Sequence, residues 1–139
     1  MSIQMILAPL FVQVALTFGL MLLMAVRRAQ AVRARQVREN EIALREPNWP
    51  PRALQAAYAY GNQFELPLLF YVPTILALFT KQADLAFVLL AWVFVVLRIL
   101  QAVVYVTSNN IRYRGAFFAA GAIVLMIMWA VFILRILLP

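Results

Sequence analysis

Four long apolar stretches divide the 139-residue chain, and they restrict its fold more than any other feature of the sequence. They run over about residues 3–26, 53–79, 83–106 and 115–138. Each is close to or above the ~20 residues with which an α-helix crosses a bilayer. Backbone groups in lipid must be satisfied within their own segment, and no stretch alternates apolar and polar residues, so all four are predicted to be helices. The chain is therefore expected to be an all-α membrane protein, a four-transmembrane-helix bundle forming one domain over residues 1–139.

Composition excludes a soluble enzyme and narrows the chemistry. Hydrophobic residues make up 66% of the chain and charged residues only 12%, whereas a soluble domain is about half apolar and a quarter charged. Because Cys and His are both absent, disulfides, a thiolate nucleophile and the commonest ligand of transition metals are absent as well. Catalysis would depend on Arg, Tyr, the few carboxylates or a reactive group carried by the substrate, and no metal site is predicted.

The basic residues predict the orientation in the membrane. The net charge is +7, and seven of the 12 basic residues lie between Arg27 and Arg52, in the first connection. The third connection holds Arg112 and Arg114, whereas the second holds only Lys81. Because Lys and Arg are enriched in cytoplasmic loops, the first and third connections are predicted to be cytoplasmic and both termini to lie outside. The cluster is typical of topology and headgroup contact, and the alternative is an anion-collecting rim above a site.

The helices are expected to extend beyond some of the apolar stretches, over about residues 3–38, 52–79, 83–109 and 115–138. The first helix should continue past the membrane surface, because no Gly or Pro interrupts the arginine-rich segment that follows it. A Pro-rich segment should then end it, and Pro50 or Pro51 should begin the second helix, where a missing N–H costs little. Pro67 and Pro73 should kink that helix or open its hydrogen-bond ladder locally.

Polar residues lie within the second and third apolar stretches, where an unpaired charge costs at least ~2.5–3.5 kcal/mol. Their spacing places them on one face of each helix: Tyr58, Asn62 and Glu65 on the second, and Arg98, Gln101 and Tyr105 on the third. Arg112 would continue the face of the third helix if that helix persisted. A Glu65–Arg98 ion pair that locks the two helices together is one interpretation. Because five or six aligned polar groups exceed what a lock needs, we favour a binding cavity.

The pattern resembles the MAPEG family, the membrane-associated proteins of eicosanoid and glutathione metabolism, over nearly the whole chain. The second helix carries Asn-Gln-Phe-Glu-Leu-Pro at residues 62–67, similar to the family's Asn-x-x-Glu followed closely by Pro. The third stretch has Arg98, then Tyr105 seven residues later, then Arg112 and Arg114, similar to the Arg, Tyr and distal Arg of the family. The two motifs together, at this spacing and topology, indicate a bacterial-type member.

The resemblance implies a homotrimer whose active sites lie between neighbouring subunits and bind glutathione as a co-substrate. It also implies roles for individual residues. Asn62 and Glu65 would bind the peptide, and Glu65 would pair with its ammonium group. Arg98 and Tyr105 would line the same pocket.

The resemblance assigns the catalytic role to a distal arginine that stabilises the glutathione thiolate, and Arg112 and Arg114 each match the spacing in some members. A nearby cation favours the charged form of a thiol, and a sulfur that arrives with the substrate fits a chain without Cys or His. Two positions depart from the family pattern: Tyr58 stands where the enzymes commonly have Arg, and Gln101 stands where one branch often has Tyr. Arg52 or another arginine of the first connection would then bind the glutathione carboxylates.

Three functions follow. The first is a glutathione-dependent enzyme of the bacterial inner membrane, a transferase or peroxidase acting on lipophilic electrophiles. The second is a non-catalytic lipid- or ligand-binding member of the same fold. The third, a small multidrug transporter coupled by Glu65, is disfavoured because the charge bias fixes one orientation and Arg98 would keep Glu65 ionised. The expected partners are membrane lipids, glutathione, lipophilic small molecules and further copies of the chain, and no nucleic acid.

Overall fold

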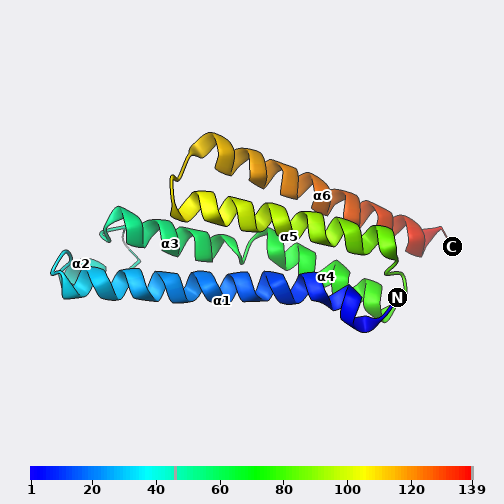
Figure 1. Ribbon diagram of the computed structural model, residues 1–139, viewed down its shortest axis with the longest axis horizontal. Helices are drawn as coiled ribbons and strands as arrows, with labels where there is room; N and C mark the ends of the chain where they lie inside the picture. The colour runs from blue at the N-terminus through cyan, green and yellow to red at the C-terminus, as the bar shows by residue number, and fades with distance from the viewer. Residues whose placement is uncertain (46, 139) are drawn as a thin grey trace.

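The computed structural model describes residues 1–45 and 47–138, and this part of the chain is helical with no strand. Its helices are α1 (Ile3–Arg33), α2 (Glu39–Ile42), α3 (Pro51–Asn62), α4 (Leu66–Phe79), α5 (Leu85–Val106) and α6 (Ile111–Leu137). Four segments are long and apolar enough to cross a membrane, and α3 and α4 together form the second. Both termini lie at one end of the elongated bundle and α2 lies at the other (Figure 1). The all-α, four-span architecture is confirmed.

Hydrogen-bonding side chains mark where several helices begin. Ser2 accepts from the N–H of Met5 at the start of α1, and Asp84 accepts from that of Phe87 at the start of α5. Asn110 accepts from the N–H of Arg112 at 3.0 Å and so begins α6 four residues earlier than the predicted residue 115. Each of these acceptors satisfies a donor that the first turn leaves free. Pro50 caps α3 and Pro51 is its first residue, as predicted.

Two helices end earlier than predicted. α1 ends at Arg33, not near residue 38, and α5 ends at Val106, not near residue 109. Beyond each end a residue with positive φ turns the chain, Arg35 (φ 55°) after α1 and Asn109 (φ 51°) after α5. A left-handed residue just past the last turn is a common helix stop, and Asn adopts it readily. With 31 residues, α1 is still about 46 Å long and exceeds the ~30 Å of a hydrocarbon core.

The second membrane segment is broken at residues 63–65, so that at Pro67 the second of the two predicted outcomes, an opened hydrogen-bond ladder, is the one observed. Pro67 has no N–H, and its ring would clash with the carbonyl of Gln63 in a continuous helix. The chain instead forms tighter contacts: the N–H of Gln63 donates to the carbonyl of Tyr60, that of Phe64 to Gly61 and that of Glu65 to Asn62. α4 then begins with Pro67 in its first turn, where proline is tolerated.

Pro73 lies inside α4 and does not break it. The carbonyl of Leu69, which would normally bond to the missing N–H of residue 73, accepts instead from Nε1 of Trp129 on α6 at 2.9 Å. A backbone group left free by proline in a membrane helix must find such a substitute. The two prolines therefore have different effects because only the carbonyl opposite Pro73 receives a donor from a neighbouring helix in the described residues.

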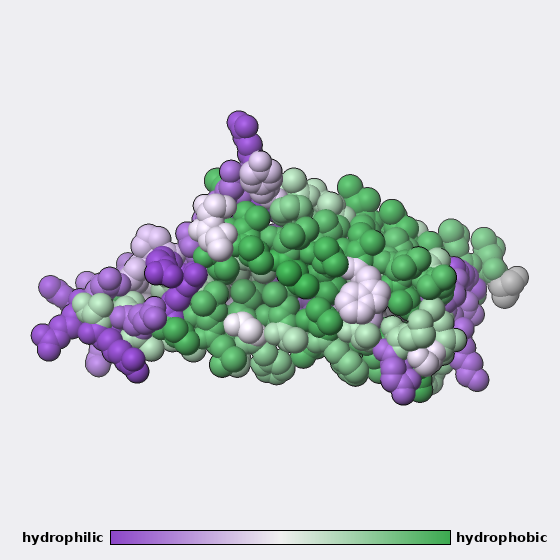
Figure 2. Space-filling model, in the orientation of Figure 1, coloured by the Kyte–Doolittle hydropathy of each residue, from purple (hydrophilic) through white to green (hydrophobic). Residues whose placement is uncertain are grey.

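The core of the bundle is aromatic and lies between α4, α5 and α6. Phe70, Phe87 and Phe94 are fully buried or nearly so, and the rings of Phe70 and Phe94 stack at 4.9 Å. On the outside, a broad apolar band covers the middle of the molecule, and polar side chains gather at its ends (Figure 2). This distribution is that of a protein whose middle faces lipid.

Arg27 closes the basic end of the bundle, where α1, α3 and α5 meet. Its guanidinium donates to the carbonyl of Arg52 at the start of α3 and to that of Val106 at the end of α5, both at 3.0 Å. At the end of α5 the cation satisfies a terminal carbonyl and interacts favourably with the helix dipole. The contact holds the three helices in register close to the polar residues described below.

Candidate functional site

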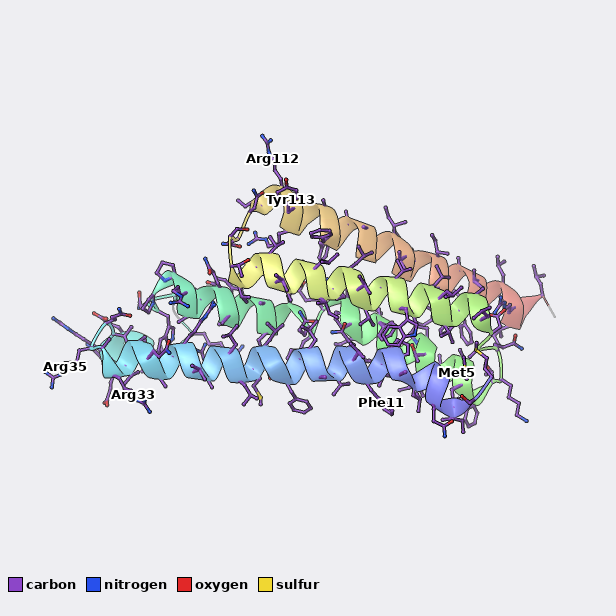
Figure 3. The ribbon with its side chains drawn as sticks, viewed as in Figure 1. Met5, Phe11, Arg33, Arg35, Arg112 and Tyr113 are labelled. Carbon is purple, nitrogen blue, oxygen red and sulfur yellow. The ribbon has the colours of Figure 1, made fainter. Side chains whose placement is uncertain are left out.

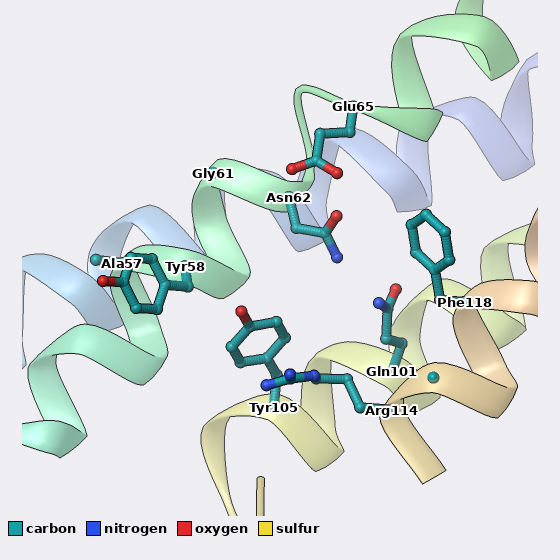
Figure 4. Close-up of a pocket in the computed structure, with 10 residues that line it drawn as sticks. Ala57, Tyr58, Gly61, Asn62, Glu65, Gln101, Tyr105, Arg114 and Phe118 are labelled. Atoms are coloured by element: carbon teal, nitrogen blue, oxygen red, sulfur yellow. The ribbon is translucent and has the colours of Figure 1, made fainter. Parts of the chain in front are cut away.

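A cavity of about 450 Å³ opens between α3, the break, α5 and α6. It is lined by Ala57, Tyr58, Gly61, Asn62, Glu65, Gln101, Tyr105, Arg114, Gly115 and Phe118 (Figure 4). Six of the nine residues predicted for the site lie in this wall. The polar faces of the second and third membrane segments therefore meet.

Asn62 links the two faces. With its amide nitrogen toward Glu65, it donates to Glu65 Oε2 at 3.0 Å, and its oxygen accepts from Arg98 Nη2 and Gln101 Nε2, both at 3.0 Å. The opposite orientation, drawn in Figure 4, sets the amide oxygen against the carboxylate and the amide nitrogen against two donors. Donors and acceptors match only in the first orientation, so we assign that one.

Arg98 lies behind the cavity wall and is completely buried. Its Nη2 also approaches the backbone carbonyl of Asn62 at 3.4 Å, and its guanidinium lies 5.9 Å from the ring centre of Phe118. Nε and Nη1 have no hydrogen-bond partner among the described residues, and neither has Oε1 of Gln101. The ion pair with Glu65 considered above is replaced by a neutral relay through Asn62. This layer keeps unused donors and an acceptor, which an interhelical lock does not require.

Arg114 is the arginine that reaches the cavity. Its guanidinium lies 4.4 Å from the ring centre of Tyr105, and its Nη1 donates to Oδ1 of Asn109 at 2.6 Å. The aromatic face and the amide oxygen hold the planar group from two sides. A charged donor is thereby fixed at the mouth of a cavity that Glu65 also lines.

Arg112 does not line the cavity; it is exposed and points away from the bundle (Figure 3). The expectation that it continues the stripe of α5 is wrong, because α5 ends at Val106 and Arg112 lies on α6. Residues two positions apart on a helix are separated by ~200° around its axis, so Arg112 and Arg114 cannot face the same side. Of the two distal arginines predicted for the site, Arg114 is the one that lines the cavity.

Arg52 also lies outside the cavity. It is exposed at the start of α3 and borders a separate depression together with Arg27 and Gln30 of α1. It precedes Tyr58 by six residues, which corresponds to ~9 Å along α3 and a rotation of ~240° from the side that Tyr58 faces. In one chain, Arg52 therefore cannot act together with the residues of this site.

Several residues of the site were not predicted from the sequence. Asn109 positions Arg114, and Phe118 packs against Arg98 and closes one wall. Gly61 and Gly115 line the cavity, and a Cβ at either position would meet open space. The Asn109-Asn110 pair was the available signal, because Asn favours both the stop of one helix and the cap of the next.

The fold and this cavity define a multi-pass membrane protein with a polar site enclosed by its second, third and fourth membrane segments. The chain matches the model of the MAPEG family over residues 6–134, and it belongs to that family. No curated protein sequence matches it significantly, and no solved structure does.

Proposed function

We propose that the protein is a glutathione-binding membrane enzyme of the transferase or peroxidase type that acts on lipophilic electrophiles. One observation carries the proposal: the carboxylate of Glu65 and the guanidinium of Arg114 line the same cavity. Glu65 is exposed and has no ion-pair partner among the described residues. Glutathione offers an ammonium group for the carboxylate and a thiol for the guanidinium.

The proposed chemistry uses the sulfur of glutathione as nucleophile. The guanidinium of Arg114 would favour the thiolate form of a thiol bound beside it. One close cation can lower a thiol pKa by ~1–3 units. The thiol proton would leave to water, and the thiolate would attack an electrophilic carbon, whose bond to its leaving group breaks as the carbon–sulfur bond forms, so that the leaving group departs with the electron pair. With a peroxide as second substrate, the thiolate would attack one oxygen and break the O–O bond, the alkoxide would take a proton to leave as an alcohol, and a second glutathione would displace water from the sulfenic acid to give the disulfide. Tyr105 and Asn109 would hold Arg114 in place, while Asn62 would orient Glu65 toward the glutathione ammonium group.

An apolar groove supports a lipophilic second substrate. It lies between α4 and α6, with a volume of about 600 Å³, and its walls include Leu66, Leu125 and Trp129. Leu66 directly follows Glu65, so the groove begins where the polar cavity ends. A molecule arriving from the bilayer could lie in the groove with its reactive atom near Arg114.

Calorimetric titration of the purified protein with glutathione tests the proposal. We expect the wild type to bind, and Glu65→Gln to weaken binding at least ~tenfold because a charge-assisted contact is lost. Gly61→Leu should abolish binding by filling the cavity, with little loss of stability, since a Cβ at this position meets no atom within 4 Å and Leu favours a helix over Gly. Gly19→Leu is the matched control, because Gly19 on α1 is equally unobstructed but lies outside the site.

Two results would contradict this proposal. One is a wild type that produces no heat with glutathione, and the other is a Gly61→Leu variant that binds it normally. The MAPEG family also includes non-catalytic members, and Tyr58 in place of the usual arginine favours this alternative. Binding of glutathione whose thiol titrates as in solution would identify the protein as a ligand-binding member rather than an enzyme.

We further propose a homotrimer in a bacterial inner membrane, with the basic connections cytoplasmic and both termini outside. The exposure of Glu65, and of half of the Tyr58 side chain, in a single chain supports a neighbouring copy that covers the cavity. Cross-linking in mild detergent should produce trimers, and only monomers would contradict this. A C-terminal reporter active only in the cytoplasm should be silent, and a strong signal would reverse the orientation.

A further inference from the structure

A second buried amide contact lies on the opposite side of the break from Asn62. Nε2 of Gln13, on α1, donates to Oε1 of Gln63 at 2.7 Å, and Nε2 of Gln63 donates to the carbonyl of Ala59 at 3.0 Å. Gln13 is completely buried and Gln63 is 2% exposed. Nothing in the proposed mechanism uses this pair.

Gln13 occupies a position where a polar side chain needs a reason. It lies in the middle of an apolar membrane helix, and such a helix satisfies its own backbone without help from side chains. Its Oε1 has no hydrogen-bond partner in the described residues, so its contact with Gln63 is the one its side chain makes there. Gln63 is the first residue of the break, where Pro67 prevents the regular helical ladder.

The break is therefore held from two sides by consecutive residues. Asn62 is bound to Arg98 and Gln101 of α5, and Gln63 is bound to Gln13 of α1. Glu65 follows two residues later and reaches the cavity from within the break. An unanchored non-helical segment could rotate its carboxylate away, because the helix no longer fixes its direction.

We infer that Gln13 is a positioning residue, which fixes the break through Gln63 so that Asn62 and Glu65 point into the cavity. The inference rests on the proposed function where glutathione is the ligand. Its structural part, the restraint of residues 63–65 by α1, does not depend on which ligand binds.

The test combines amide hydrogen exchange, thermal unfolding and glutathione titration on purified Gln13→Leu, Gln63→Leu and the double variant. Gln13→Leu should speed exchange at Phe64 and Glu65 and weaken glutathione binding, each about tenfold, as expected for the loss of one buried hydrogen bond. It should also lower the unfolding temperature, because Gln63 keeps an unsatisfied oxygen. The double variant should recover most of the lost thermal stability, since neither side of the Gln13–Gln63 contact is left unpaired, although the carbonyl of Ala59 loses its side-chain donor. It should keep the fast exchange and the weak binding.

That separation distinguishes positioning from ordinary stabilisation. If the double variant recovers stability, exchange and affinity together, Gln13 is only structural and the inference is wrong. Thr74→Val is the matched control: Thr74 is also completely buried, but among the described residues its hydroxyl bonds only to the carbonyl of Phe70 within α4. Its loss should leave both exchange at the break and glutathione affinity unchanged.

Two further arms keep the test decisive. If Gln13→Leu does not fold, Gln13→Asn retains the amide but is one methylene too short to reach Gln63, and it should give the same fast exchange. If wild-type protein does not bind glutathione, the proposed function fails, and exchange at Phe64 and Glu65 alone decides the role of Gln13. Unchanged exchange in both Gln13 variants would overturn the inference.

Discussion

Two arginines at different depths in the bundle have different partners: one forms an ion pair and the other contacts only neutral groups among the described residues. Arg135, near the end of α6, forms an ion pair with Asp84 at 2.7 Å and donates to the carbonyl of Gln82 at 3.1 Å. This is the one ion pair within 4 Å among residues 1–45 and 47–138. Arg98, completely buried in α5, has only neutral oxygens as partners and keeps two nitrogens unused.

Arg135 is neutralised by a carboxylate of its own chain, whereas Arg98 keeps hydrogen-bond donors without partners among the described residues. At the end of the bundle that carries the termini, Asp84 neutralises Arg135, and this partly exposed ion pair joins the second connection to α6. Around Arg98, the nearest acid, Glu65, reaches the guanidinium through the amide of Asn62. Gln101 and Asn62 line the cavity, and Arg98 lies directly behind them with two nitrogens that have no partner among the described residues. Ligand effects should therefore concentrate around Arg98, and purely mechanical effects around Arg135.

The largest expected effect concerns the thiol of glutathione bound in the cavity beside Arg114. Arg114→Leu should raise the pKa of the thiol of bound glutathione by ~1–3 units, the range that one close cation can produce. For a thiol with an unperturbed pKa of ~8.5, this lowers the thiolate fraction at neutral pH by about ten- to thirtyfold. Ultraviolet absorbance of the thiolate, followed against pH, measures it. Arg112→Leu is the control on the same helix, and it should leave the curve unmoved. Equal effects of both replacements would contradict the assignment to Arg114.

The next prediction sets the two arginines against each other directly. Arg98→Met should leave the free energy of unfolding unchanged or raise it by ~1 kcal/mol, because a buried cation with unused donors is replaced by an apolar chain. The same variant should weaken glutathione binding. Arg135→Met should lower stability by up to ~1 kcal/mol and leave binding intact. Denaturation in mixed micelles and calorimetry would reveal whether stability and binding separate in this way.

The comparison also shows what the sequence could and could not predict. The four membrane segments follow from length and apolarity alone, and the spacing of Asn62, Glu65, Arg98 and Tyr105 was enough to predict a shared site. The sequence predicted either a kink or an opened ladder at Pro67 and could not choose between them, because proline removes a hydrogen bond locally while the neighbouring helices decide which of the two the chain adopts.

The choice between the distal arginines depended on the end of α5 and the start of α6. Arg112 and Arg114 both lie in the first turn of α6, and the cap at Asn110 fixes where that turn begins and so which of the two faces the cavity. Gln13 stands out in the sequence as a polar residue in an apolar stretch. Its partner is 50 residues away, and spacing along one helix carries no information about such a contact.

A smaller effect is expected where α6 repairs α4. Trp129→Phe should lower the free energy of unfolding by about 0.6–1 kcal/mol, the usual range for a hydrogen bond between membrane helices. The carbonyl of Leu69 then loses the donor that replaces the N–H missing at Pro73. Trp92→Phe removes the same indole group from α5, where the described residues offer it no hydrogen bond, and it serves as control. Equal losses in both variants would indicate packing rather than the carbonyl.

The smallest predicted effect is the pH dependence of the stability that the Arg135–Asp84 ion pair contributes. The hydrogen bond from Arg135 lowers the pKa of Asp84 below its usual range, and the N–H of Phe87 adds to this. A depressed pKa in the folded state means that the contribution to stability is complete above the unfolded value of ~3.9. It is then lost as the pH falls through the folded value. Because the two side chains are 31% and 51% exposed, solvent screening should limit this contribution to about 0.5 kcal/mol.

Asp84→Asn isolates that contribution, because asparagine still caps α5 while the charge is lost. The variant should be slightly less stable than the wild type at pH 7, and the two should converge below about pH 4 as the wild-type carboxyl protonates. Glu39→Gln on α2 is the control, since Glu39 is exposed and forms no ion pair among the described residues. Unfolding in mixed micelles between pH 7 and pH 3 measures the difference. If the stability difference between the wild type and Asp84→Asn persists at low pH, Asp84 acts through helix geometry rather than through its charge. The contrast between Arg135, neutralised by a carboxylate, and Arg98, with only neutral partners among the described residues, would then not explain the stability of this end of the bundle.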